Sequence, residues 1–164
     1  MSQSARPPAG RQPGQGRPAY QFSGVSPEEL RQIIVEGDPV RLVEVAERVG
    51  RELAQPEGRR THPDALATSQ IRSIFGKVRE LDMQLRAAVA AEHDQLDDGI
   101  YRELHLLRPK LAYQAERAPG QGVRHLQQVL EPAIKLVERS RARFQRFVDF
   151  FEAILAYHKA YGGQ

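Results

Sequence analysis

The sequence predicts an all-α protein, a compact bundle of five or six helices preceded by a disordered N-terminal tail. Apolar residues recur at the spacing of helix faces, and Ser, Asp, Pro and Gly stand where helices would begin and end. The composition agrees, because five Tyr, six Phe and no Trp are spread among many charged residues. At 164 residues the chain can bury one core, so we expect a single domain over residues 25–164.

The predicted tail, residues 1–24, is rich in Pro, Gly, Gln and Arg and has almost no apolar side chain before Tyr20. Such a segment cannot bury enough surface to offset the entropy lost on ordering, so we expect disorder. Its three arginines would give weak, non-specific affinity for RNA. An extension without a role is the simpler interpretation.

Two short helices are expected next. Ser26-Pro27-Glu28-Glu29 combines a capping Ser, a Pro at the first helical position and a Glu three residues on, which predicts a helix to about Glu36. Gly37 ends it, and Asp38-Pro39 starts a second helix to about Gln55. The residues expected on the apolar face of this second helix are Val40, Val43, Ala46, Val49 and Leu53. The two helices would form a hairpin, followed by a loop over residues 56–66.

A long third helix follows Thr68, and a fourth follows an acidic link. The third has apolar residues at helical spacing at Ile71, Ile74, Phe75, Val78, Leu81, Leu85 and Val89. The fourth has its apolar face at Ile100, Leu104, Leu107, Leu111 and Ala115. Pro109 lies inside the fourth helix and should kink it, because proline removes a backbone donor.

A fifth helix is expected from about Val123 to Arg139, with Pro132 inside it. The last helix ends at Gly162-Gly163. Its apolar residues follow helical spacing at Phe144, Phe147, Val148, Phe151, Ile154, Leu155 and His158. We expect His158 to be a hydrogen-bonded histidine at the edge of the core rather than a metal ligand.

Several classes of protein are disfavoured. The chain has no cysteine, which excludes disulfide scaffolds and thiolate metal sites. No apolar run approaches the roughly 20 residues that span a bilayer, so we expect a cytoplasmic protein with no membrane contact. The five histidines lack metal-site spacing, and neither a phosphate-binding loop nor a catalytic serine motif is present. We therefore expect no metal, no cofactor and no catalytic residue.

The net charge of +3 conceals an uneven distribution. Residues 25–98 carry 10 basic and 15 acidic side chains, whereas residues 99–164 carry 11 basic and 6 acidic ones. Such asymmetry permits a basic surface for a polyanion and an acidic surface for another contact, including one with a second copy.

The positions of the basic residues on the expected helices are the evidence in favour of a nucleic-acid-binding function. Arg72, Arg79 and Arg86 lie within about 40° of one another on the third helix and are spaced by about 10 Å. Such a line suits a polynucleotide backbone, or its arginines pair with neighbouring acids on a solvated face.

Basic residues also alternate with aromatic ones on two later helices. Lys110, Tyr113 and Arg117 share one face of the fourth helix. If the last helix is continuous, one of its faces carries Arg139, Arg143, Arg146, Phe150, Tyr157 and Tyr161. This pattern favours phosphate neutralisation with base stacking. The alternative is that the aromatics pack on another helix or another copy, which we prefer for Phe150.

Three segments resemble a known family. They are residues 68–72 (TSQIR), residues 107–113 (LRPKLAY) with Arg117, and residues 144–154 (FQRFVDFFEAI), continuing into Ala156-Tyr157-His158-Lys159 and Gly162-Gly163. Together, and in this order, they are similar to the helical small subunit of the type III-A CRISPR effector, the Csm complex. The resemblance covers about residues 60–164. The hairpin at residues 26–55 matches only in being helical.

The resemblance implies a non-catalytic subunit in antiviral defence, present in several copies and stacked beside the backbone filament that holds the crRNA. Its implied partners are crRNA, target RNA, other Csm effector subunits and additional copies of itself, with RNA contacted without base specificity. The residues that lie both in matched segments and on basic faces are Arg72, Lys110, Arg117 and Arg146. A second group of RNA-binding candidates is Arg79, Arg86, Arg143 and Lys159.

Three other hypotheses remain from the residues alone. A protein-interaction adaptor bundle with no direct nucleic-acid binding would use its basic faces on acidic partners. A helix-turn-helix DNA binder is disfavoured, because no short helix, tight turn and recognition helix stand together. A hydrolase is disfavoured because no convergent catalytic site can be assembled.

Overall fold

The computed structural model describes residues 20–59, 61–88 and 94–164. Within these ranges the chain forms six α-helices and no strand, as the sequence predicts. Their bounds are α1 Pro27–Leu30, α2 Pro39–Ala54, α3 Thr68–Ala87, α4 Asp98–Arg117, α5 Gly122–Val137 and α6 Arg141–Ala160. A π-helical stretch, η1 (Arg31–Glu36), continues α1, and a 3-10 turn, η2 (Pro56–Gly58), follows α2.

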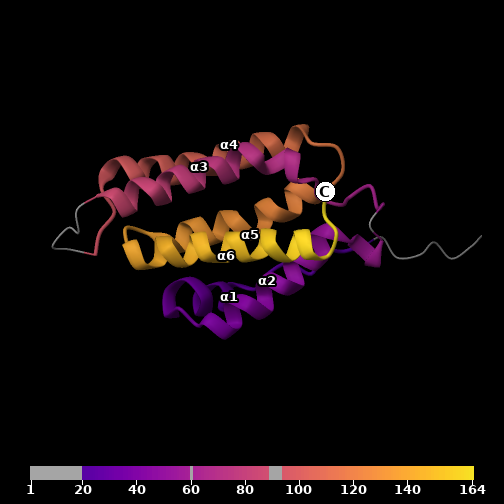
Figure 1. Cartoon of the computed structure of the whole chain (residues 1–164), viewed down its shortest axis with the longest axis horizontal. Helices are drawn as coiled ribbons and strands as arrows, with labels where there is room; N and C mark the ends of the chain where they lie inside the picture. The colour runs from indigo at the N-terminus through magenta and orange to yellow at the C-terminus, as the bar shows by residue number, and fades with distance from the viewer. Residues whose placement is uncertain (1–19, 60, 89–93) are drawn as a thin grey trace, which may run out of the picture.

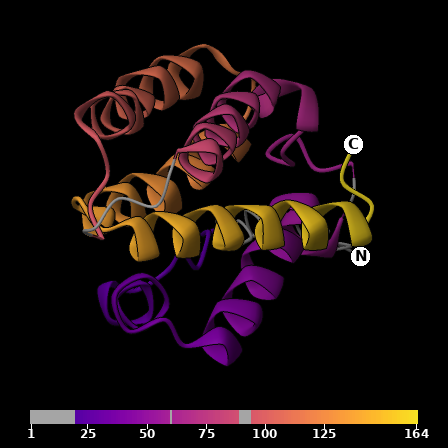
Figure 2. The same ribbon diagram turned by 60° about the vertical axis from the view of Figure 1, so that its left-hand side comes forward.

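The helices form three layers (Figure 1). The α3–α4 pair lies on one side, α5 and α6 form the middle layer, and α1 with α2 lies on the other side. Figure 2 shows α6 running across the molecule between α3 and α2. The middle layer is therefore covered on both sides, which explains why α5 and α6 contribute so many fully buried residues.

The predicted helix starts are confirmed by their caps. The Ser26 hydroxyl accepts a hydrogen bond from the Glu29 amide at 3.1 Å, and the Glu29 carboxylate accepts one from the Ser26 amide at 3.0 Å. Asp38 caps α2 by accepting from the amides of Val40 and Arg41, both at 3.0 Å. The first helix ends at Gly37, whose φ of 75° is readily adopted only by glycine.

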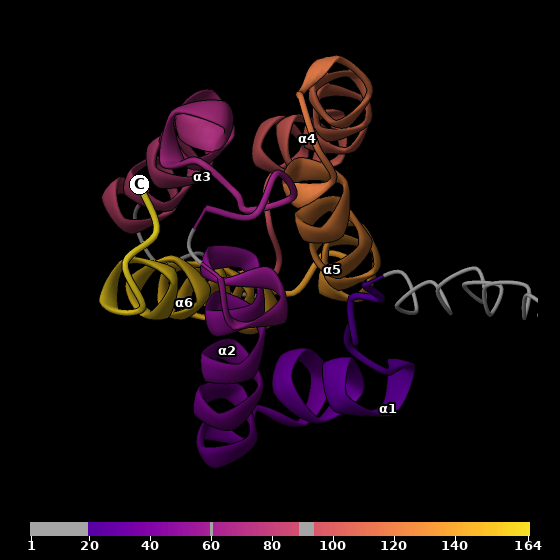
Figure 3. The ribbon, with the colours of Figure 1, turned by 90° about the vertical axis from the view of Figure 1, so that its right-hand side faces the viewer.

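The predicted apolar face of α2 is wrong at its beginning. Val40 and Val43 are 65% and 45% exposed, whereas Val45, Ala46, Val49 and Leu53 are buried. Figures 2 and 3 show the reason: α2 begins away from α6, and its later turns lie against that helix. Periodicity locates a helix face, but it cannot tell where the neighbouring helix ends.

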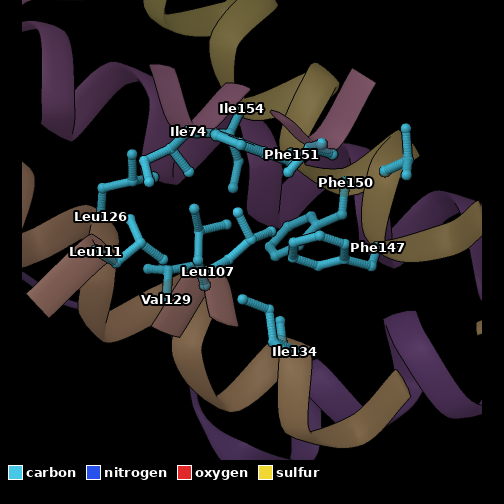
Figure 4. Packing of buried hydrophobic residues seen from close by; sticks show 14 of the residues in the cluster. Ile74, Leu107, Leu111, Leu126, Val129, Ile134, Phe147, Phe150, Phe151 and Ile154 are labelled. Atoms are coloured by element: carbon cyan, nitrogen blue, oxygen red, sulfur yellow. The ribbon is translucent and has the colours of Figure 1, made fainter. Parts of the chain in front are cut away.

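The core is centred on the aromatic residues of α6. Phe144, Phe147, Phe150 and Phe151 are all fully buried. Figure 4 shows Phe147 and Phe150 packed with Leu107 from α4 and Ile134 from α5 nearby. The preferred interpretation of Phe150, packing on another helix, is thus confirmed.

His158 lies in the core as expected. It is 1% exposed, and its Nε2 lies 2.7 Å from the carbonyl oxygen of Leu66, in the segment between η2 and α3. Because a carbonyl only accepts, Nε2 carries the proton. The carboxyl end of the chain closes over this ring: the backbone of Gly163 lies against it, and Gln164 accepts a hydrogen bond from the Thr68 amide.

Most of the predicted tail lies outside the described residues, but its last five residues are described and contact the bundle. Phe22 stacks on His125 of α5 with ring centroids 4.7 Å apart. The Ser23 amide donates to Glu52 at 3.0 Å, and the Gly24 carbonyl accepts from Arg48 at 3.2 Å. The aromatic and polar contacts of this segment hold it against α2 and α5, although it forms no helix.

Candidate nucleic-acid interface

A groove of about 690 Å³ runs along the exposed side of the α3–α4 pair. It forms because both helices direct their apolar residues, such as Ile71 of α3 and Leu107 of α4, into the core. Small or polar residues are left where the helices part at the surface. α3 supplies Ser73, Gly76, Lys77 and Glu80, and α4 supplies Pro109, Lys110, Tyr113 and Gln114.

Hydrogen bonds and ion pairs join the two sides of this groove. Gln114 donates to the Ser73 hydroxyl at 2.6 Å, which links α4 to α3. Lys77 lies 3.2 Å from Glu80 and 3.4 Å from Glu103 of α4. The hydrogen bond that Lys77 donates to Glu80 raises the pKa of Lys77, so its ammonium stays charged but is already paired.

Tyr113 is the most exposed aromatic residue of the α3–α4 pair, at 61%. The guanidinium carbon of Arg117 lies 5.4 Å from its ring centroid, and Arg117 also donates a hydrogen bond to its hydroxyl. A second hollow, of about 270 Å³, is lined by both residues, whereas the larger groove is lined by Tyr113 without Arg117. Tyr113 therefore stands between the two hollows, with the guanidinium on the smaller side.

Gly76 is an exposed glycine within α3. Glycine in a helix interior destabilises the helix by about 1 kcal/mol relative to alanine. A Cβ added at Gly76 would meet no atom of the described residues within 4 Å. Gly50 of α2 differs, because a Cβ there would lie 2.7 Å from the carbonyl oxygen of Ile154. Packing within the described chain therefore explains Gly50 and does not explain Gly76.

Four of the eight predicted RNA-binding residues are exposed and make no ion pair within the described parts of the chain. They are Arg72, Lys110, Arg117 and Lys159. The start of α3 and the ends of α4 and α6 lie at the same end of the molecule (Figure 1), which places Arg72, Arg117 and Lys159 toward that end. These cations are available to an anionic ligand.

Two of the predicted residues on α3 have acidic partners instead. The Nε atom of Arg86 lies 3.0 Å from the buried carboxylate of Asp82. Arg79 forms an ion pair with Glu152 of α6 and lies 4.0 Å from Asp82. The alternative interpretation of the arginine line, pairing with neighbouring acids, thus holds for these two residues and not for Arg72.

The basic and aromatic row expected on the last helix does not form one exposed surface. The helix begins at Arg141, so Arg139 lies outside it and pairs with Asp98 at 2.7 Å. Arg143 donates to the carbonyl of Leu136 at 3.2 Å, and it lies 3.3 Å from Glu138.

Arg146 contacts the backbone of η1 rather than an acidic side chain. Its Nη1 donates to the carbonyls of Ile34 at 3.2 Å and Val35 at 2.9 Å. These contacts satisfy carbonyls at the end of a helical segment and tie α6 to the first layer.

Two features of this surface are not among the residues predicted from the sequence. Arg102 lies eleven residues before Tyr113 and so on nearly the same side of α4; it is exposed and makes no ion pair among the described residues. Gly76 is the second, although a glycine inside a helix and away from its apolar face is a sequence feature that indicates a packing or functional role.

Two findings bear on other kinds of site. Within residues 20–59, 61–88 and 94–164, no group of three His, Cys, Asp or Glu side chains is placed to hold a metal ion. The helices described here also include none with the length and hydropathy that crossing a bilayer requires.

A protein-family model matches the chain. No curated protein matches the chain. The family model described as Csm2 Type III-A matches residues 36–164, which include α2 to α6 and all three segments of the resemblance. The match covers most of the chain and agrees with the all-helical fold. The chain therefore belongs to the Csm2 family, the structural subunits of the type III-A CRISPR effector complex.

Proposed function

We propose that this chain binds the phosphate backbone of crRNA and target RNA without reading bases, while performing no chemistry itself. The observation that carries the proposal is the set of exposed cations on the α3–α4 side of the molecule that make no ion pair with an acidic residue of the described ranges. Lys110 and Arg117 lie one on each side of Tyr113, and Arg72 lies on the neighbouring helix. Side chains of this kind neutralise phosphates and release counterions.

Within this proposal the eight predicted residues divide into two groups. Arg72, Lys110, Arg117 and Lys159 form the RNA-contacting set, because their charges are not paired with any acidic residue that the structure describes. Contacts within the protein already occupy Arg79, Arg86, Arg143 and Arg146. For these four residues, RNA contact stays a prediction.

The proposal has two further parts. Several copies of the chain stack in the effector complex, and the complex acts in antiviral defence in the cytoplasm. Family membership supports the association with other Csm subunits.

The test is binding of the purified chain to unrelated single-stranded RNAs across a salt series. We expect weak, sequence-independent binding whose log Kd rises linearly with log salt concentration. The triple variant Arg72→Ala, Lys110→Ala, Arg117→Ala should stay folded and show both a lower affinity and a shallower salt slope. A matched variant, Arg31→Ala, Arg41→Ala, Arg59→Ala, removes three charges that pair with Glu36, Glu44 and Glu57 and should bind nearly as the original does.

The alternative is a protein-interaction adaptor that does not contact nucleic acid. It predicts no RNA binding even at low salt, and equal behaviour of the two triple variants. That result would overturn RNA-backbone binding by this chain.

A further inference from the structure

Gly76 leaves the backbone of α3 uncovered where this helix lines the α3–α4 groove. The residue is exposed and lines the groove, and a Cβ would meet nothing there within 4 Å. The described fold therefore gains nothing from the missing side chain, while the helix loses stability. A missing side chain at such a place lets a ligand from outside approach the helix backbone closely.

Tyr113 and Pro109 provide a flat apolar surface across the groove from Gly76. They lie four residues apart on α4, which places them one turn from each other on the same side. The guanidinium of Arg117 is on the side of Tyr113 that faces the smaller hollow, so the ring is open toward the larger one. A planar ring can therefore stack on Tyr113 from within the groove.

The charges of the groove differ between its two ends. Lys77 pairs with both Glu80 and Glu103, so one positive charge faces two negative ones and this part of the groove offers no attraction to an anion. Lys110 and Arg117 supply positive charge near Tyr113, and neither pairs with an acid in the part of the chain that the structure describes. A ligand with a planar uncharged ring attached to an anionic group matches this arrangement.

We propose that the α3–α4 groove takes one unstacked nucleobase of a bound RNA strand. The base stacks on Tyr113 against the backbone at Gly76, and the adjoining phosphates lie on Lys110 and Arg117. The volume of about 690 Å³ lies within the range of about 300–1,000 Å³ that is usual for small-ligand sites. Stacking tolerates every base, so the site adds affinity without sequence specificity. This inference rests on the proposed RNA-backbone binding.

The test compares two oligomers of equal length and charge on the full chain. One is a single-stranded RNA with a fluorescent 2-aminopurine base, and the other is the same ribose-phosphate chain without bases. Gly76→Leu places a side chain where the base would approach α3, without changing the charge. The control Ala156→Leu adds the same side chain on the exposed side of α6, outside the groove. Circular dichroism and thermal melting establish that both variants are folded.

We expect the original chain to bind the RNA more tightly than the base-free oligomer, by a factor between about 5 and about 150. Gly76→Leu should remove that difference and the 2-aminopurine quenching, while leaving affinity for the base-free oligomer unchanged, and Tyr113→Ala should remove the quenching. Ala156→Leu should behave as the original chain. Gly76→Ala should raise the melting temperature by about 2 °C while weakening RNA binding, a combination that a purely structural glycine would not give.

A result that contradicts the base site differs from one that contradicts backbone binding. Equal affinity for both oligomers, unaffected by Gly76→Leu, would overturn the base site and leave the backbone-binding function in place. No binding of either oligomer at low salt would overturn both. An acidic peptide that displaces the RNA from the original chain, and binds Gly76→Leu poorly, would assign the groove to a protein partner instead.

Discussion

His158 shows how one buried side chain joins distant parts of the sequence. It connects α6 to the segment before α3 through the carbonyl of Leu66, and the backbone of Gly163 covers its ring. Burial lowers the pKa of His158 below its ordinary value of 6.5, because the charged ring would lose its water. The folded protein therefore favours the neutral form.

This lowered pKa predicts that acid weakens the fold. At pH values below about 6.5, the unfolded chain binds a proton at this position and the folded chain resists it, so the free energy of unfolding falls as pH falls. Burial lowers the pKa of His105 and His125 in the same direction. The melting temperature at pH 5.5 should therefore be below that at pH 7.5. His158→Gln should reduce this difference, and a pH-independent melting temperature would contradict the prediction.

We expect Arg146 to contribute to the stability of the fold, because its guanidinium already contacts the backbone of η1. Arg146→Ala removes the donors to the carbonyls of Ile34 and Val35 and should lower the free energy of unfolding by about 2 kcal/mol in urea titrations. Arg72→Ala, an exposed change with no described ion pair, should change it by less than about 0.5 kcal/mol. Equal effects of the two substitutions would refute the structural role of Arg146.

Two glycines inside helices have opposite relations to their neighbours. Gly50 lets α2 approach α6, because a Cβ there would lie 2.7 Å from both the Ile154 carbonyl and the Tyr157 Cβ. Gly76 of α3 faces open space. Each glycine lies inside a regular α-helix, so the two positions differ only in what packs against the helix there.

Replacement of each glycine by alanine should therefore have effects of opposite sign. Gly50→Ala should destabilise the protein by about 1–3 kcal/mol, because α2 and α6 must separate. Gly76→Ala should stabilise it by about 0.5–1 kcal/mol through higher helix propensity. Urea unfolding of the two variants and of the unsubstituted chain measures both changes in the free energy of unfolding. Destabilisation by Gly76→Ala would show that the position is packed, which would also remove the basis of the base site.

At the scale of the whole molecule, the N-terminal segment determines where the folded unit begins. Phe22 stacks on His125, and Ser23 bonds to Glu52, so α5 and α2 are joined by residues that precede α1. Removal of residues 1–19 should leave the melting temperature unchanged. Removal of residues 1–24 should lower it by about 2–4 °C, because these contacts are lost. If both truncations melted alike, the segment would contribute nothing to stability.

The sequence by itself determined the helices of this protein, because caps and apolar spacing are local. Ser26, Asp38 and Gly37 mark their helix ends through contacts within a few residues. The three family segments were likewise readable without a structure. Only the tertiary structure decided which cations are held by contacts within the protein. Arg79 pairs with Glu152, and Arg146 donates to the carbonyl of Ile34, at sequence separations of 73 and 112 residues. Because the spacing of residues along one helix does not report contacts with another helix, neither contact could be predicted from the sequence.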